Sequence, residues 1–226
     1  MSSALLAGWI AWQMGWVWAV AGLIGVLVHE FGHVLAINAL GCGPGRIQIV
    51  PFVGGAAFPA RPPETEFKGV LIALAGPVFG LLALAPFFAA YAATGQERWL
   101  GGAFFIAIVS LINLAPAPPL DGSKAFGPAL ARIHPLVERA ALIVVAAAVA
   151  FWAFSRGSLV FALFVALGAL GVLRRGRLRP AARPLNLVEW GGAVALYVAA
   201  LAICAAAVVL TLDRPALAGL LHLVDA

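Results

Sequence analysis

Charged residues are scarce in this chain. Only 10% of its 226 residues are Asp, Glu, Lys or Arg, while 64% are hydrophobic, and the mean hydropathy is +1.05. Several apolar stretches approach or exceed the roughly 20 residues that a helix needs to cross a bilayer. No soluble domain of ordinary size remains once these stretches are removed. We therefore expect an all-α polytopic membrane protein that forms one integral membrane domain over residues 1–226.

Cysteine and N-terminal basic residues are also sparse. The two cysteines are Cys42, near an expected helix end, and Cys204, inside an apolar run. Two such distant thiols do not indicate a disulfide framework or a thiolate metal site. No Lys or Arg precedes Arg46, so the basic region of a cleavable signal peptide is missing and we expect no such peptide.

Apolar runs predict about six transmembrane helices. Residues 4–40 are almost continuously apolar, which predicts either one long tilted helix or a short helix, a break near Gly15 and a span from about Trp16. The further expected spans are 67–93, 99–114, 136–154, 157–173 and 186–212. Residues 122–135 are expected to be a surface segment. The motif-bearing core described below covers about residues 16–125, and additional spans occupy about 136–212.

A short β-hairpin is expected directly after the first span. The sequence GCGPG at 41–45 ends the helix, because Gly and Pro clusters cannot continue it. Residues 46–63 then carry β-branched and aromatic residues around Gly54 and Gly55, a pattern typical of a hairpin. Its apolar character suggests that it dips into the membrane, where non-helical backbone is tolerated only if it is buried in protein or lines a wet cavity.

The basic residues lie mostly on one side of this topology. The loops after the first, third and fifth spans carry 11 of the 14 basic residues. The opposite side carries the other three, which are Arg98, Arg156 and Arg214. By the positive-inside rule those three loops face the cytoplasm. The arginine cluster at 174–183 is expected to contact lipid headgroups, with no nucleic-acid role. Glu189, beside Trp190, is expected to pair with an arginine.

Three polar side chains interrupt the first span. His29, Glu30 and His33 lie within the apolar run 27–40, and ionisable residues at membrane depth are rare and usually functional. Residues four apart share a helix face, so His29 and His33 can hold one metal ion. Glu30 is turned about a quarter of the way round the helix, where it can act on a water molecule without ligating the metal. This is the HExxH pattern of zinc hydrolases, and a structural polar cluster is the simpler alternative.

Asp121 is the candidate third ligand, because catalytic zinc usually takes three protein ligands. It follows a span that ends in Pro116, Pro118 and Pro119. The alternative is that Pro-Leu-Asp-Gly is only a turn; its pairing with the HExxH pattern favours the ligand. Two imidazoles and a carboxylate also suit iron, so zinc is inferred from ligand type.

The motifs HEFGH at 29–33 and NLAPAPPLDG at 113–122 resemble the two signatures of the site-2 protease family, the intramembrane zinc metalloproteases. PFVGG at 51–55 resembles the membrane-dipping hairpin of that family, and AGPVFG at 75–80 also matches. The resemblance covers about residues 20–125. Gly80 stands where the family commonly has Asn, and we interpret Gly76 and Gly80 as a helix-packing pair.

The resemblance implies specific roles for five residues. His29, His33 and Asp121 would bind one Zn²⁺ per chain, Glu30 would be catalytic, and Asn113 would contact the substrate backbone. A turn or cap role for Asn113 is the alternative.

The resemblance also implies the substrates and the location. The substrates would be transmembrane proteins in a lipid bilayer, and the chain would be a minimal form without a PDZ or CBS domain. We expect a bacterial or archaeal cell membrane, with the active site toward the cytoplasm. The competing hypothesis is a non-proteolytic metal-binding membrane protein, either a carrier, a sensor or an inactive homologue. Glu30 favours the protease over this alternative, because metal transport has no obvious need for a carboxylate beside the metal ligands.

Overall fold

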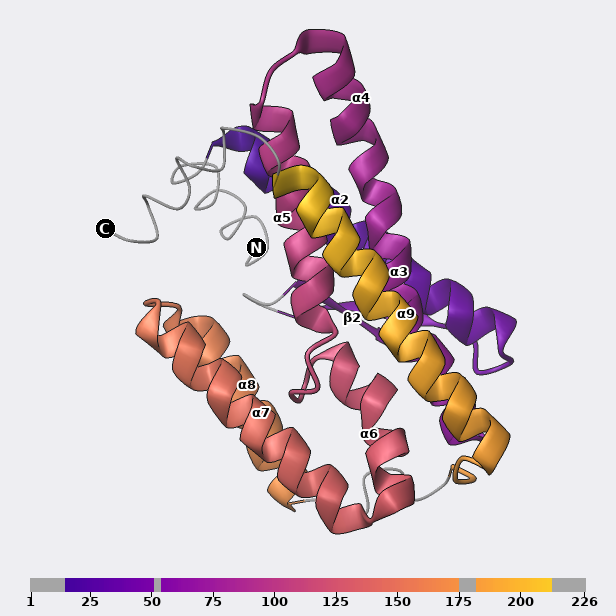
Figure 1. Cartoon of the computed structure of the whole chain (residues 1–226). Helices are drawn as coiled ribbons and strands as arrows, with labels where there is room; N and C mark the ends of the chain where they lie inside the picture. The colour runs from indigo at the N-terminus through magenta and orange to yellow at the C-terminus, as the bar shows by residue number, and fades with distance from the viewer. Residues whose placement is uncertain (1–14, 51–53, 175–181, 213–226) are drawn as a thin grey trace.

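The computed structural model describes residues 15–50, 54–174 and 182–212, which form a helical protein with one small β-hairpin (Figure 1). In chain order the elements are α2 (Trp16–Ala39), β1 (Arg46–Val50), β2 (Gly54–Phe58), α3 (Glu66–Gly80), the 3-10 helix η1 (Leu81–Leu84), α4 (Ala85–Thr94), α5 (Arg98–Asn113), α6 (Asp121–Ile133), α7 (Pro135–Ser155), α8 (Leu159–Arg174) and α9 (Leu187–Leu212).

Four helical segments in the described part of the chain are long and apolar enough to cross a membrane. They are α2, the continuous segment Glu66–Thr94 made by α3, η1 and α4, and the helices α7 and α9. The helices α5 and α8 are shorter but also apolar. Large apolar side chains such as Val188, Phe151 and Leu210 are 84%, 74% and 71% exposed, as lipid-facing residues are. The all-α polytopic membrane fold predicted from the sequence is confirmed.

Glycines with positive φ flank helix α2. Gly15 has a φ of 97° immediately before α2, and Gly41 has a φ of 77° after it. At the C-terminal end the Cys42 amide donates to the Ile37 carbonyl at 2.9 Å. The sequence left two arrangements open, and the structure has the one with a break at Gly15, because a helix does not continue through a residue with positive φ. The short N-terminal helix that this arrangement expects would lie before Gly15, outside the described residues.

The hairpin is antiparallel, with Arg46 paired to Phe58 and Val50 paired to Gly54. Gly54 and Gly55 therefore belong to strand β2 and do not form the turn. The connecting residues 51–53 lie outside the described part of the chain.

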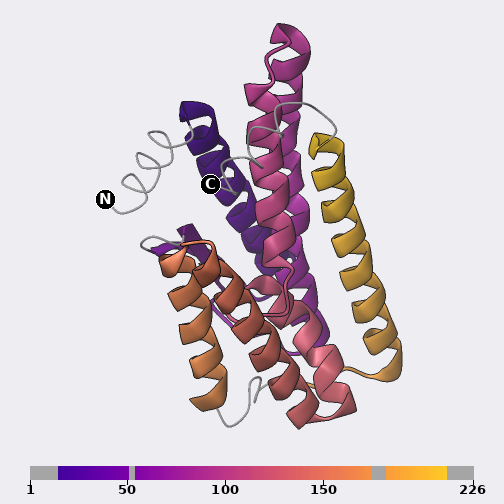
Figure 2. The same cartoon turned by 60° about the vertical axis from the view of Figure 1, so that its left-hand side comes forward.

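The expected surface segment after the third span is the helix α6. Its Ala125 and Ala129 are buried, whereas Lys124 is exposed, so the helix is amphipathic. It packs against α3, α7 and α9. Figure 2 shows α6 at the lower end of the molecule, between the α7–α8 pair on one side and α9 on the other.

The start of α9 is tied to α6 and to the segment before α3. The Trp190 indole donates to the Ala129 carbonyl at 3.1 Å, and the Glu66 amide donates to the Arg183 carbonyl at 2.9 Å. The carboxylate of Glu189 pairs with the Arg183 guanidinium, which confirms the predicted pairing of Glu189 with an arginine. These contacts fix the position of α9 at the end of the molecule where α6 lies.

Candidate metal centre

Two imidazoles meet on one face of α2. The Nε2 atoms of His29 and His33 lie 3.1 Å apart, and both residues are buried. The four-residue spacing places them one helical turn apart on the same face. The helix alone therefore brings two nitrogen donors to one point.

Asp121 comes to the same point from a distant part of the chain. It is the first residue of α6 and is buried. Its Oδ2 lies 3.0 Å from His29 Nε2 and 3.1 Å from His33 Nε2. The structure thus brings together the three residues that the sequence singled out as candidate ligands.

The donor set fits a zinc ion. Ligands at ordinary zinc distances and tetrahedral angles lie about 3.3 Å from one another. The three separations among the imidazole nitrogens and the carboxylate oxygen are 3.0–3.1 Å, so only a small outward shift would admit the ion. Two imidazoles and one carboxylate also form a ligand set that leaves a further position for water, as in catalytic zinc sites.

Outer contacts orient two of the three candidate ligands. His33 Nδ1 lies 2.7 Å from the Ile72 carbonyl oxygen on α3. Because a carbonyl accepts, Nδ1 carries the proton and Nε2 is left free to ligate, the arrangement usual for metal-bound histidine. On α6 the Lys124 ammonium lies 3.1 Å from Asp121 Oδ1, the oxygen that the histidines do not contact.

The same lysine influences the ionisation of Asp121. Burial raises the pKa of this carboxyl, but the Lys124 ammonium and the hydrogen bonds with the two imidazoles outweigh that effect and hold the pKa well below its ordinary value. The carboxyl is therefore ionised at neutral pH, which is the form that a metal ligand needs.

Gly76 of α3 lies directly against the imidazoles. A Cβ at this position would be 2.2 Å from His33 Nε2 and 2.8 Å from His29 Nε2. The sequence interpretation of Gly76 as a packing residue is therefore incomplete, because this glycine also leaves room beside the donor atoms. The AGPVFG motif pointed to this glycine in the sequence, but the motif alone does not show that Gly76 faces the two imidazoles.

Glu30 is a buried carboxylate beside this group. It is 7% exposed, and no group in the described residues hydrogen-bonds to its Oε2. Strand β2 packs on it closely, since a Cβ on Gly55 would lie 2.7 Å from Glu30 Cγ. A buried carboxylate oxygen without a partner is costly, and among the described residues Oε2 is free to accept a hydrogen bond or a proton.

Asn113 is not part of the cluster. It is the last residue of α5, half-buried, and its Nδ2 donates to the Val109 carbonyl of its own helix at 3.1 Å. Gly80 lies between α5 and α2. A Cβ added to Gly80 would lie 3.0 Å from Ser110 Oγ and 3.7 Å from His29 Nδ1. Close helix packing at Gly80 thus agrees with the interpretation made from the sequence.

Comparison with protein families identifies a family that matches this chain. The model of the family described as Peptidase M50B-like matches residues 1–120, more than half of the chain, and the match ends one residue before Asp121. A comparison with curated proteins and with solved structures found no match. The match agrees with the resemblance to the site-2 proteases carried by the HEFGH and NLAPAPPLDG motifs. This chain therefore belongs to the Peptidase M50B-like family of membrane metalloproteases.

Proposed function

We propose that this protein is an intramembrane zinc protease that hydrolyses a peptide bond in or near a transmembrane segment of another membrane protein. The observation that carries the proposal is the buried Glu30 carboxylate with its unpartnered Oε2, adjacent in the helix to a ligand of the His29, His33 and Asp121 cluster. A carrier or a sensor needs the cluster but has no evident use for this carboxylate.

Each residue has a distinct task in the proposed mechanism. His29, His33 and Asp121 would hold one Zn²⁺, which supplies Lewis acidity that polarises the scissile carbonyl and acidifies water. Glu30 accepts the proton of the attacking water and returns it to the leaving amine. The Ile72 carbonyl holds the proton of His33 on Nδ1, so the lone pair of Nε2 is the one that would bind the metal.

The hairpin is the proposed docking element for the substrate. A helical substrate must unwind before attack, because its carbonyls are engaged in its own hydrogen bonds. Strand β2 runs past Glu30 at Gly55, so an unwound segment that added to the edge of the two-stranded sheet would pass close to the catalytic carboxylate. Asn113 is proposed as a further contact to the substrate backbone. The asymmetry of basic residues supports a membrane orientation with the site toward the cytoplasm.

The test compares the wild type with Glu30→Gln. The full chain is reconstituted in liposomes with a panel of single-span membrane proteins tagged at both ends, and cleavage and zinc content are measured together. We expect one zinc per chain in both forms and a loss of cleavage of at least about 100-fold in Glu30→Gln, the usual contribution of a general base.

Two outcomes would contradict the proposal. Cleavage by Glu30→Gln at the wild-type rate would remove Glu30 from the mechanism. Failure of the wild type to cleave any member of a broad panel, while it still binds zinc, would favour a carrier, a sensor or an inactive homologue.

A further inference from the structure

The loop that delivers Asp121 is buried between helices that lie beyond the family match. Residues 114–120 connect α5 to α6, and Leu114, Ala117 and Leu120 are each 5% exposed or less. A Cβ on Gly168 of α8 would lie 2.5 Å from the carbonyl group of Pro118. The other side of the loop faces α9. The conformation of this loop, and with it the position of Asp121, therefore depends on helices that carry none of the family motifs.

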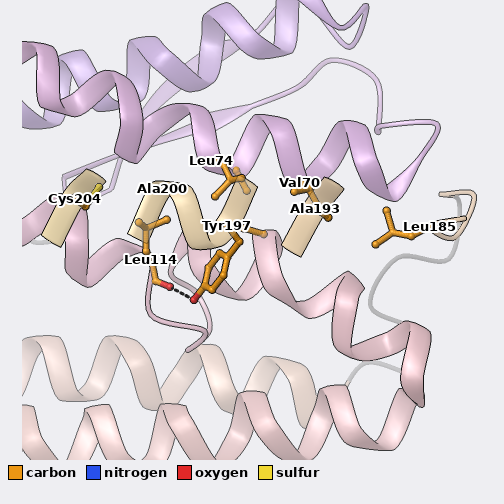
Figure 3. Close-up of a cluster of buried hydrophobic side chains, with 10 residues drawn as sticks. Val70, Leu74, Leu114, Leu185, Ala193, Tyr197, Ala200 and Cys204 are labelled. Carbon is orange, nitrogen blue, oxygen red and sulfur yellow. Dashed lines mark hydrogen bonds between the residues drawn. The ribbon is translucent and has the colours of Figure 1, made fainter. Parts of the chain in front are cut away.

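Helix α9 makes a polar contact with this loop. The Tyr197 hydroxyl donates to the Leu114 carbonyl at 2.6 Å (Figure 3). Tyr197 is 6% exposed, and its ring stacks on Phe126 of α6 with the ring centroids 4.7 Å apart and the planes 21° apart. One side chain of α9 thus touches both the loop and the helix whose first residue is Asp121.

Gly122 packs directly against the same Leu114 carbonyl. A Cβ on Gly122 would lie 2.0 Å from Leu114 O and 2.3 Å from Leu114 C. Gly122 directly follows Asp121 in the chain. The position of the Leu114 carbonyl therefore limits where the backbone of Asp121 can lie.

We propose that Tyr197 is a positioning residue for the metal centre. Its hydroxyl holds the Leu114 carbonyl, Gly122 packs on that carbonyl, and the carboxylate of Asp121 is thereby kept at the two imidazoles. The inference rests on the proposed metal role of Asp121, but it does not require that the protein cleave a substrate. Groups that hydrogen-bond a metal ligand directly commonly change metal affinity by about 10–100-fold, and Tyr197, which acts through the Leu114 carbonyl, is expected at the lower end of that range.

The test is the zinc affinity of Tyr197→Phe, measured on the full chain in detergent by competition with a fluorescent chelator. This variant removes the hydroxyl and keeps the ring that stacks on Phe126. The matched control is Thr211→Val on the same helix. Among the described residues, the fully buried Thr211 hydroxyl bonds within α9 alone, to the carbonyls of Ala207 and Val208. We expect the zinc dissociation constant to rise about tenfold in Tyr197→Phe and to stay unchanged in Thr211→Val.

A double-mutant cycle separates positioning from a general loss of stability. If the hydroxyl acts through Asp121, Tyr197→Phe has no further effect on zinc affinity in an Asp121→Ala background. Wild-type affinity in Tyr197→Phe, or an equal loss with and without Asp121, would overturn the inference. Because zinc binding is measured without a substrate, a wild type that binds zinc but cleaves nothing would contradict the proposed function and leave the role of Tyr197 standing.

Discussion

The Lys124 ammonium lies 3.1 Å from Oδ1 of Asp121, whereas both imidazoles contact Oδ2. The two residues are three apart on α6, so one helical turn joins them. The Lys124 side chain is 63% exposed, and an exposed ion pair contributes little stability. The consequence of the contact is geometric: each carboxylate oxygen has its own partner, and Oδ2 is left for the proposed metal.

Replacing Lys124 is therefore expected to weaken metal binding more than it weakens the fold. Lys124→Met keeps the length of the side chain and removes the charge that holds Oδ1. We expect about a tenfold rise in the zinc dissociation constant, with a thermal midpoint of the metal-free protein close to that of the wild type. Zinc titration and thermal unfolding in detergent measure the two effects.

The control for this prediction is Lys68→Met. Lys68 also pairs with a carboxylate, Glu64, at 2.9 Å, but that carboxylate is not a candidate ligand. The variant removes the same charge from the protein. Equal losses of zinc affinity in the two variants would show a general electrostatic effect and contradict a specific role for Lys124.

Gly76 gives a direct test of where the metal binds. A methyl group in Gly76→Ala would lie 2.2 Å from His33 Nε2, so it would occupy the space beside the donor atom. We expect zinc binding to fall below detection, because either the imidazole or α3 has to move. Gly69→Ala is the matched control, since this glycine lies on the same helix and a Cβ there meets no atom within 4 Å. Wild-type zinc content in Gly76→Ala would place the metal elsewhere.

Local patterns predicted the parts of the site that lie on one helix. The four-residue spacing of His29 and His33 places them on one helix face, independently of the rest of the fold. The lengths of the apolar runs predict the ends of the spans to within a few residues. Lys124 could have been found in the same way, because it lies three residues after Asp121 on a helix whose pattern is amphipathic. No periodicity links Asp121 to His29. It was inferred from the need for a third ligand and from its place after a span that ends in prolines, and the family resemblance then supported it.

Other contacts between distant elements could not be predicted from the sequence. The Gly76–Gly80 spacing indicates close packing but not which side chains the glycines face. Tyr197 is one of the few polar residues in the apolar helix α9, and nothing in the sequence pairs it with the Leu114 carbonyl. In both cases the partner is set by how α2, α3, α6 and α9 pack, and the family motifs contain only part of that arrangement.

The contact between β2 and Glu30 predicts a variant that separates catalysis from metal binding. In Gly55→Ala the new Cβ would lie 2.7 Å from Glu30 Cγ and 3.2 Å from Cδ, so the carboxylate has to shift. A misplacement of about 1 Å costs on the order of 100-fold in rate, and we expect such a fall in kcat for a cleaved substrate. Zinc affinity should stay at the wild-type value, because the three atoms nearest to a Cβ at Gly55 belong to Glu30 and Ile47 and to none of the candidate ligands. A parallel loss of zinc would show instead that the hairpin supports the ligand set.

The close packing of α8 against the proline-rich loop at residues 114–120 predicts that added volume at Gly168 displaces this loop. A Cβ in Gly168→Ala would lie 2.5 Å from the backbone of Pro118 and from Pro119 Cδ, and backbone cannot move aside as a flexible side chain can. Overpacking of this kind costs about 1–3 kcal/mol, so the thermal midpoint should fall and zinc affinity should fall with it, because the displaced loop leads to Asp121.

Gly171→Ala is the control on the same helix. A Cβ at Gly171 meets no atom within 4 Å, and alanine favours a helix over glycine by about 0.5–1 kcal/mol. The thermal midpoint should therefore rise or stay the same, with zinc affinity unchanged. A Gly168→Ala protein with unaltered midpoint and zinc affinity would show that the loop adapts to α8 without moving Asp121. The position of Asp121 would then depend on the contact between Tyr197 of α9 and the Leu114 carbonyl, and not on α8.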